Sequence, residues 1–190
     1  MSIDPACTDT TEAVARASGA TVVRAPSSGY DGPVLAGVAA ASSTATHILF
    51  LDAGGKYVMD SIATMLEKAP PDAPIVYGVR NAQQFWHQRL GNLMFALVLQ
   101  ARFRGPWVAD VSSVRLIRSD TLSRLRLEDR QFSLPFQTTV HALKQGIPIV
   151  FIPIRCTATR IGVSKVSGSH RNSARAALQM ALSIVKAPRF

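Results

Sequence analysis

Cysteine is scarce in this chain of 190 residues, which contains only Cys7 and Cys156. Neither lies near a second cysteine or a histidine at metal-ligand spacing, so a disulfide framework and a zinc site are not expected. The four histidines, at positions 47, 87, 141 and 170, share no ligand spacing either. The sequence therefore predicts neither a zinc enzyme nor a Ser-His-Asp hydrolase.

Long apolar runs are also missing, since no stretch reaches the roughly 18 apolar residues that a membrane-spanning helix needs. The first residues, MSIDPACTDTTEA, lack the basic start and apolar middle of a signal peptide. We therefore expect a cytoplasmic protein. With 47% hydrophobic residues the chain can bury one substantial core, which predicts a single domain over residues 1–190.

Acidic residues are few, because 12 Asp and Glu stand against 21 Lys and Arg, and the formal net charge is +9. Such a balance favours anionic partners, namely phosphates, nucleic acid or an acidic membrane surface. Nucleic-acid binding is the weakest of these, because the basic residues do not alternate with aromatic ones and no helix-turn-helix signature appears. We predict no nucleic-acid partner.

What the chain does contain is an alternation of strand-like and helix-like segments. Strands are predicted at residues 20–23, 47–52, 75–79, 114–118 and 147–154, and helices at 10–18, 33–41, 61–68, 83–101, 120–125, 138–145 and about 172–186. This pattern predicts an α/β fold with a central, mostly parallel sheet flanked by helices. The apolar run HILFLD ends on Asp52, as expected for a central strand whose tip opens into a site.

Four segments carry a resemblance to a known family: residues 4–23 (DPACTDTTEAVARASGATVV), 50–56 (FLDAGGK), 110–118 (DVSSVRLIR) and 147–171 (IPIVFIPIRCTATRIGVSKVSGSHR). In this order and spacing they resemble family 2 glycosyltransferases of the GT-A fold, especially the branch similar to dolichyl-phosphate mannose synthase. The resemblance implies one GT-A-like, Rossmann-like domain. Its parts would be a nucleotide-sugar-binding half (1–80), an acceptor-side half (81–158), a basic flexible loop (159–171) and a C-terminal helix (172–190).

The resemblance also implies roles for individual side chains. It places Asp4 and Asp9 near the nucleoside, Asp52 at the metal and diphosphate, Arg160, Ser164 and Lys165 on a lid over the phosphates, and Arg80, Arg89, Arg115 and Asp110 on the substrate-binding and acceptor side. Asp110 is the best candidate for a general base, although an acceptor that is already an anionic phosphate needs none. Cations at the diphosphate favour a transition state in which negative charge accumulates on the leaving group.

The implied function is transfer of a sugar from a UDP- or GDP-sugar to a polyprenyl phosphate or other small acceptor, an activity of the EC 2.4 class. Such an enzyme would use Mg²⁺ or Mn²⁺. Three acids expected from the family are missing, however, and Pro5, Gly54 and Gln137 stand in their places. A lone Asp52 would hold a hard divalent cation weakly, so a metal-independent reaction is an equal expectation.

Lys56 stands where the family often has glutamine. One hypothesis is that its ammonium replaces the metal at the diphosphate, and the alternative is a solvated turn residue. The coordinated loss of acids also supports a second function, that of a catalytically inactive glycosyltransferase-like protein that binds or scaffolds a partner. The basic loop has a similar alternative, which is plain solvated disorder.

The chain begins after the position of the apolar strand, ending in Pro-x-x-Asn-Glu, with which family members start. If that strand is missing, its uncovered neighbours predict a homodimer or a partner subunit. The last predicted helix has an apolar side and basic ends at Arg175 and Lys186. It would either lie on the inner membrane face, where polyprenyl phosphate is found, or pack on its own domain.

Overall fold

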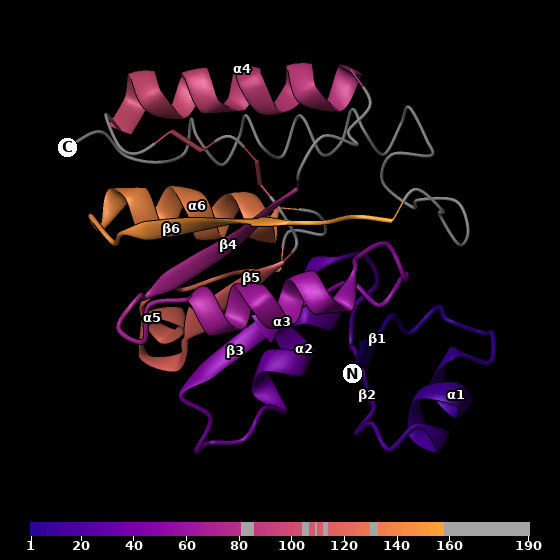
Figure 1. The fold of residues 1–190 in the computed structure, drawn as a ribbon. Coiled ribbons are helices and arrows are strands. Elements are labelled where there is room, and N and C mark those ends of the chain that lie inside the picture. The colour runs from indigo at the N-terminus through magenta and orange to yellow at the C-terminus, as the bar shows by residue number, and fades with distance from the viewer. Residues whose placement is uncertain (81–85, 104–106, 109, 112–113, 130–132, 158–190) are drawn as a thin grey trace.

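The computed structural model describes residues 1–80, 86–103, 107–108, 110–111, 114–129 and 133–157. Its centre is a sheet of four strands: β3 (His47–Phe50), β4 (Ile75–Arg80), β5 (Arg115–Arg118) and β6 (Ile149–Ile154) (Figure 1). The strands lie in the order β3-β5-β4-β6. β4 and β6 pair in parallel, whereas β5 runs antiparallel to both of its neighbours.

The α/β class predicted from the sequence is confirmed, but the sheet is mixed rather than mostly parallel. β3, β4 and β6 share one direction, as expected for strands joined through helices. β5 is the exception, because the chain enters it from the end of the sheet at which β4 finishes and leaves it directly into a helix at the other end. Two of the three strand pairs are antiparallel for this reason.

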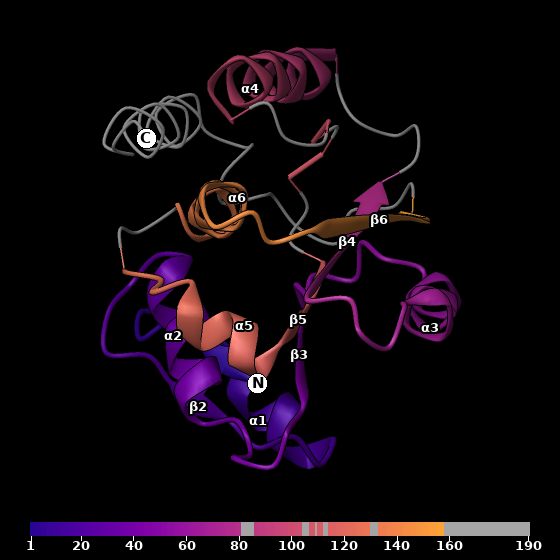
Figure 2. The same ribbon diagram turned by 90° about the vertical axis from the view of Figure 1, so that its left-hand side faces the viewer.

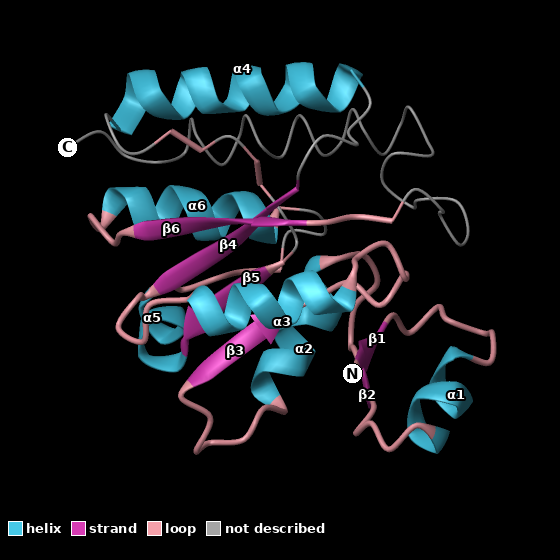
Figure 3. Ribbon diagram, viewed as in Figure 1, coloured by secondary structure: helices cyan, strands magenta, loops and turns pink. Residues whose placement is uncertain are grey.

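The helices lie in separate layers around the sheet (Figures 2 and 3). They are α2 (Asp31–Ala39), α3 (Met59–Lys68), α4 (Trp86–Phe103), α5 (Ser119–Arg124) and α6 (Leu134–Lys144). Figure 2 shows α3 on one face of the sheet, α5 and α6 on the other, and α4 beyond α6. A smaller unit at the N-terminus holds α1 (Thr11–Ala17) and the parallel pair of β1 (Ser2–Ile3) with β2 (Val23–Arg24).

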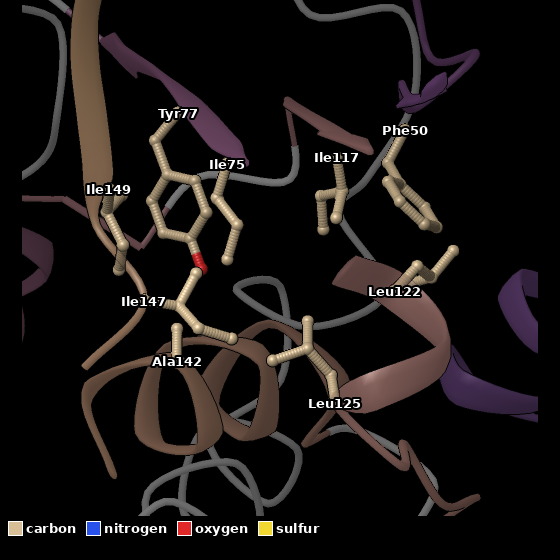
Figure 4. Packing of buried hydrophobic residues seen from close by; sticks show 9 residues of the cluster. All are labelled: Phe50, Ile75, Tyr77, Ile117, Leu122, Leu125, Ala142, Ile147 and Ile149. Carbon is tan, nitrogen blue, oxygen red and sulfur yellow. The ribbon is translucent and has the colours of Figure 1, made fainter. Parts of the chain in front are cut away.

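The core follows the two-residue alternation of strand side chains. On β4, Ile75 and Tyr77 point to the face that α5 and α6 cover, where they pack with Ile117 and Leu125 (Figure 4). Val76, between them, joins the opposite cluster, which packs against α3. Burial on both faces explains why this segment is a continuous apolar run in the sequence.

The described part of the chain includes no helix that is both long and apolar enough to span a bilayer.

Candidate functional site

Asp52 lies just past the carboxyl end of β3, where the sequence analysis placed it. The turn that follows returns the Lys56 side chain to this carboxylate, and Nζ of Lys56 lies 2.6 Å from Oδ2 of Asp52. The side chains of Lys56 and Asp52 are 34% and 32% exposed, so the ion pair is partly buried and still reachable from solvent. The two residues form the centre of the candidate site.

Tyr57 lies against this ion pair, and Tyr30 interacts with it electrostatically. Nζ of Lys56 lies 4.9 Å from the centre of the Tyr57 ring, within the range of a cation–π contact. Burial lowers the pKa of the Lys56 ammonium, but Asp52 and Tyr57 together raise it by more. The pKa of Lys56 therefore stands above its ordinary value. Burial also raises the pKa of Tyr30, an effect that Arg115 opposes and the Asp52 carboxylate reinforces. Tyr30 is therefore part of the same electrostatic cluster.

The turn that carries Lys56 is fastened to the end of β6. The backbone N–H of Thr157 donates to the carbonyl of Lys56 at 2.9 Å, and the Thr157 hydroxyl donates to the carbonyl of Gly55 at 3.2 Å. One residue further on, Tyr57 and Cys156 form an isolated antiparallel bridge. Thr157, the last residue that the structure describes, is therefore attached to the Lys56 turn.

A second ion pair lies beside this turn. Arg80, the last residue of β4, holds Asp110 through Nη2 to Oδ1 at 2.5 Å and through Nε and its backbone N–H to Oδ2 at 2.8 and 3.2 Å. The Asp110 side chain is only 2% exposed. Burial lowers the pKa of Arg80 but Asp110 raises it more, so the guanidinium stays charged.

The end of β6 connects the two ion pairs, because Arg80 pairs with Ile154 and Cys156, two residues later, bridges to Tyr57. The thiol of Cys156 interacts with groups of both pairs. Burial raises its pKa, Arg80 and Lys56 lower it, and Asp110 raises it again. The structure thus brings together four residues that the sequence analysis assigned to the site: Asp52, Lys56, Arg80 and Asp110.

Asp4 and Asp9 have local partners that shape the backbone. Asp4 accepts from the backbone N–H of Ala6 at 2.8 Å and of Gly29 at 3.0 Å, which ties the N-terminal unit to the turn before Tyr30. Asp9 accepts from the backbone N–H of Thr11 at 2.9 Å, at the start of α1. Asp4 therefore borders the Tyr30 side of the site, and Asp9 belongs to the helix start.

Arg115 is fully buried in the sheet. Its Nη1 donates to the Thr138 hydroxyl at 3.0 Å, and its guanidinium lies 5.0 Å from the centre of the Phe50 ring. Nε and Nη2 have no hydrogen-bond partner among the described residues. A direct contact between Arg115 and a substrate would need the covering side chains to move, so the arginine is placed beneath the site.

Two buried polar residues fix the start of α6 and the loop before it, and the sequence analysis missed the role of both. Asp31 accepts from the backbone N–H of Ser133 and of Leu134, each at 3.0 Å. Gln137, which stands where the family has an acid, accepts from the N–H of Glu128 at 3.0 Å and donates to the Glu128 carbonyl at 2.8 Å. An acid directly after the Gly-Tyr turn was the available signal for Asp31, but its partners lie about 100 residues away.

The remaining predicted site residues fall outside what the structure describes. Arg89 belongs to α4, but its side chain lies among those that are not described. Arg160, Ser164 and Lys165 lie in residues 158–190, outside the described ranges.

The residues at Asp52 do not suit a divalent metal. Mg²⁺ and Mn²⁺ prefer several oxygen ligands, usually including more than one carboxylate. In the ranges that the structure covers, no group of three His, Cys, Asp or Glu side chains is arranged to hold a metal ion. Gly54 supplies no side chain, and an ammonium lies against the Asp52 carboxylate.

Comparison with known proteins identifies the family. The chain is 32% identical over 175 residues to an uncharacterised glycosyltransferase of Mycobacterium bovis. The aligned region covers 90% of this chain and 79% of that protein. An uncharacterised glycosyltransferase of Mycobacterium tuberculosis matches equally well. This chain belongs to the glycosyltransferases. No protein-family model matches it.

The fold has a solved counterpart in glucosyl-3-phosphoglycerate synthase from Mycobacterium tuberculosis. Its complex with Mn²⁺, UDP-glucose and phosphoglyceric acid superposes with a TM-score of 0.72 at 16% identity, over 94% of this chain and 64% of that one. The complex of the same synthase with Mg²⁺ and UDP gives a TM-score of 0.73. The chain therefore has a GT-A-like fold and spans less than two thirds of that synthase.

Proposed function

We propose that this glycosyltransferase moves a sugar from a nucleotide diphosphate, UDP or GDP, to an acceptor held on the Asp110 side of the site. The observation that carries the proposal is the Asp52–Lys56 ion pair at the carboxyl end of β3, with the Arg80–Asp110 pair beside it. In open α/β sheets ligands bind at this edge. The solved synthase of the same fold was crystallised with UDP-glucose, which supports a uridine nucleotide as the first donor to test.

The basic segment after β6 is the natural second contact for the diphosphate. Thr157, the last described residue, is bonded to the Lys56 turn, and Arg160 follows it three positions later in the sequence. On this proposal Arg160, Ser164 and Lys165 join Lys56 on phosphate oxygens. Cationic groups there would stabilise the charge that develops on the departing nucleotide diphosphate.

The acceptor that fits best is one whose attacking oxygen is already ionised, such as a polyprenyl phosphate. Asp110 is the remaining candidate for a base, but three N–H groups of Arg80 already hold its carboxylate. Taking a proton from an acceptor hydroxyl would break that ion pair. A phosphate acceptor needs no base, so Asp110 would then position Arg80 for the acceptor's charge.

The second candidate is an inactive, partner-binding glycosyltransferase-like protein. The observation that favours it is Gln137, which stands in place of an acid. Its side-chain amide forms hydrogen bonds with the backbone of Glu128 and with the Ser133 hydroxyl. Such a protein would form a homodimer or bind another subunit that covers the position of the missing first strand, and it would not turn over.

Calorimetry with UDP- and GDP-sugars, followed by a transfer assay with radiolabelled donor and polyprenyl phosphate in detergent, separates the two candidates. We expect saturable binding of one nucleotide class and label in the lipid product. Lys56→Gln should weaken donor binding, whereas Lys68→Gln, at an exposed lysine that ends α3, should not. Binding without transfer to any acceptor would favour the inactive protein, and no binding of either nucleotide would refute donor recognition.

A further inference from the structure

We propose that the Lys56 ammonium occupies the position of the divalent cation at the donor diphosphate, so that this chain binds nucleotide diphosphates without metal. The inference rests on the proposed function and specifies how its donor site works. The residues at Asp52 do not fit a metal, and the side chain that lies against the carboxylate is itself a cation, 2.6 Å away.

The charges at the site support this exchange. Two carboxylates and a divalent cation, as in the metal-dependent members of the family, sum to zero. Here Gly54 removes one carboxylate, and Asp52 with Lys56 also sums to zero. In the absence of nucleotide, a divalent cation added to the present site would leave an excess of two positive charges in a partly buried position, which electrostatics disfavours.

The ammonium is both fixed and accessible. The N–H of Thr157 donates to the Lys56 carbonyl and so holds the backbone of Lys56, and the Lys56 ammonium lies over the Tyr57 ring. An ammonium has three N–H donors, of which Asp52 accepts one and the Tyr57 hydroxyl interacts with another. Because 34% of the side chain is exposed, a phosphate oxygen can approach the ammonium from solvent.

Packing does not explain the missing second carboxylate. A Cβ added at Gly54 would meet no atom within 4 Å, and Gly54 is not among the glycines with positive φ. An aspartate would therefore fit there without strain. The site has room for a metal-binding carboxylate and carries an ammonium two residues later instead.

The experiment is calorimetric titration of the full chain with UDP and with GDP, in EDTA and in Mn²⁺. Mn²⁺ binding is measured separately by electron paramagnetic resonance, which needs no activity. We expect nucleotide binding in EDTA, a change of less than about twofold on adding Mn²⁺, and no stoichiometric Mn²⁺ binding.

Two sets of variants test the role of the ammonium. Lys56→Gln should weaken nucleotide binding at least tenfold, Lys56→Arg should retain most of it, and the control Lys68→Gln should leave it unchanged. Gly54→Asp combined with Lys56→Gln should bind Mn²⁺ and should bind nucleotide only when Mn²⁺ is present. Circular dichroism melting of each variant shows whether it is folded. Even if a variant does not fold, the wild-type titrations show whether nucleotide binding requires Mn²⁺.

The outcomes separate this inference from the proposed function. Nucleotide binding by the wild type that requires Mn²⁺, or full affinity in a folded Lys56→Gln variant, overturns the inference and leaves the proposed function standing. Failure of the wild type to bind either nucleotide under both conditions overturns both.

Discussion

Asp31 and Leu134 meet across about 100 residues of sequence, and the carboxylate of Asp31 accepts a hydrogen bond from the backbone N–H of Leu134 at 3.0 Å. The neighbouring Ser133 donates to the same carboxylate through its N–H and its hydroxyl. A carboxylate at a helix N-terminus satisfies N–H groups that the helix itself leaves unpaired. This contact fixes the start of α6 against the start of α2, directly beside Tyr30.

Asp31→Asn is expected to destabilise the protein, because Asp31 is fully buried and its charge-assisted hydrogen bonds are lost. Hydrogen bonds to a charged group contribute about 1.5–3 kcal/mol, so we expect a loss of about 2 kcal/mol and a fall in Tm of about 4–8 °C. Differential scanning calorimetry measures this shift. Asp60→Asn, at an exposed position in the first turn of α3, is the control and should lose less than about 1 kcal/mol, because only an exposed interaction with the helix dipole is removed.

Asp110→Asn should be more damaging, since it leaves the Arg80 guanidinium without its counter-charge. Removing one partner of a buried ion pair costs about 3–5 kcal/mol. The exposed pair of Arg118 with Asp120 provides the control, and Asp120→Asn should cost less than about 1 kcal/mol in a urea unfolding curve. A midpoint for Asp110→Asn equal to that of the wild type would show that the pair does not support the fold.

Gly32→Ala is expected to disturb the turn before α2. A Cβ at Gly32 would lie 2.2 Å from Oγ and 2.7 Å from the carbonyl oxygen of Ser27, and the backbone would have to shift. Overpacking of this kind costs about 1–3 kcal/mol. Gly54→Ala introduces the same methyl group into open space and serves as the comparison in chemical denaturation. Equal stability of the two variants would contradict the packing seen at Gly32.

Tyr77→Phe should change how stability depends on pH. Burial raises the pKa of Tyr77 above 10.0, so the unfolded chain loses its phenol proton first and the wild type loses stability as pH rises above about 10. Below that pH the variant should be less stable by about 1 kcal/mol, because it lacks the 2.9 Å bond to the Thr139 hydroxyl. The urea midpoints of the wild type and of Tyr77→Phe should therefore differ at pH 8 and lie closer together at pH 10.5.

Thr139→Val is the matched control for that series. It removes the same hydrogen bond but keeps the buried phenol, so its stability should decline with pH as steeply as that of the wild type. A parallel decline in Tyr77→Phe would assign the alkaline sensitivity to another group.

Much of the sheet could be predicted from the sequence, because its strands are buried on both faces. The runs at 47–52 and 75–79 correspond to β3 (His47–Phe50) and β4 (Ile75–Arg80). The direction of β5 could not be predicted, since an apolar run carries no information about which way its neighbours run. The result is a mixed sheet where a mostly parallel one was expected.

The long helix shows the limit of periodicity. The spacing of Leu93, Met94, Leu97 and Val98 predicts that they face the core, but they are 41–54% exposed, and α4 instead buries Phe95, Ala96 and Leu99. This prediction was wrong because α4 is apolar on both sides. When two stripes are apolar, spacing alone cannot say which one faces the sheet.

The candidate site also has a part that could be predicted from the sequence and a part that could not. Asp52 could be found because a carboxylate that ends a buried strand needs a polar environment, and Lys56 is near enough in sequence for a pairing to be considered. The clamp of Arg80 on Asp110 joins residues 30 positions apart, and the contact of Asp31 with α6 is longer still. Such partnerships depend on the three-dimensional arrangement of strands and helices, which local patterns do not contain.

The empty space around Gly54 bears on how this branch of the glycosyltransferases can evolve. If the Lys56 ammonium replaces the metal as proposed, a donor site that relies on a soluble ion and one that carries its own charge would differ at only two side chains, with the backbone left as it is. Relatives on either side of such a step would keep the same fold while differing in their dependence on the cell's supply of manganese or magnesium.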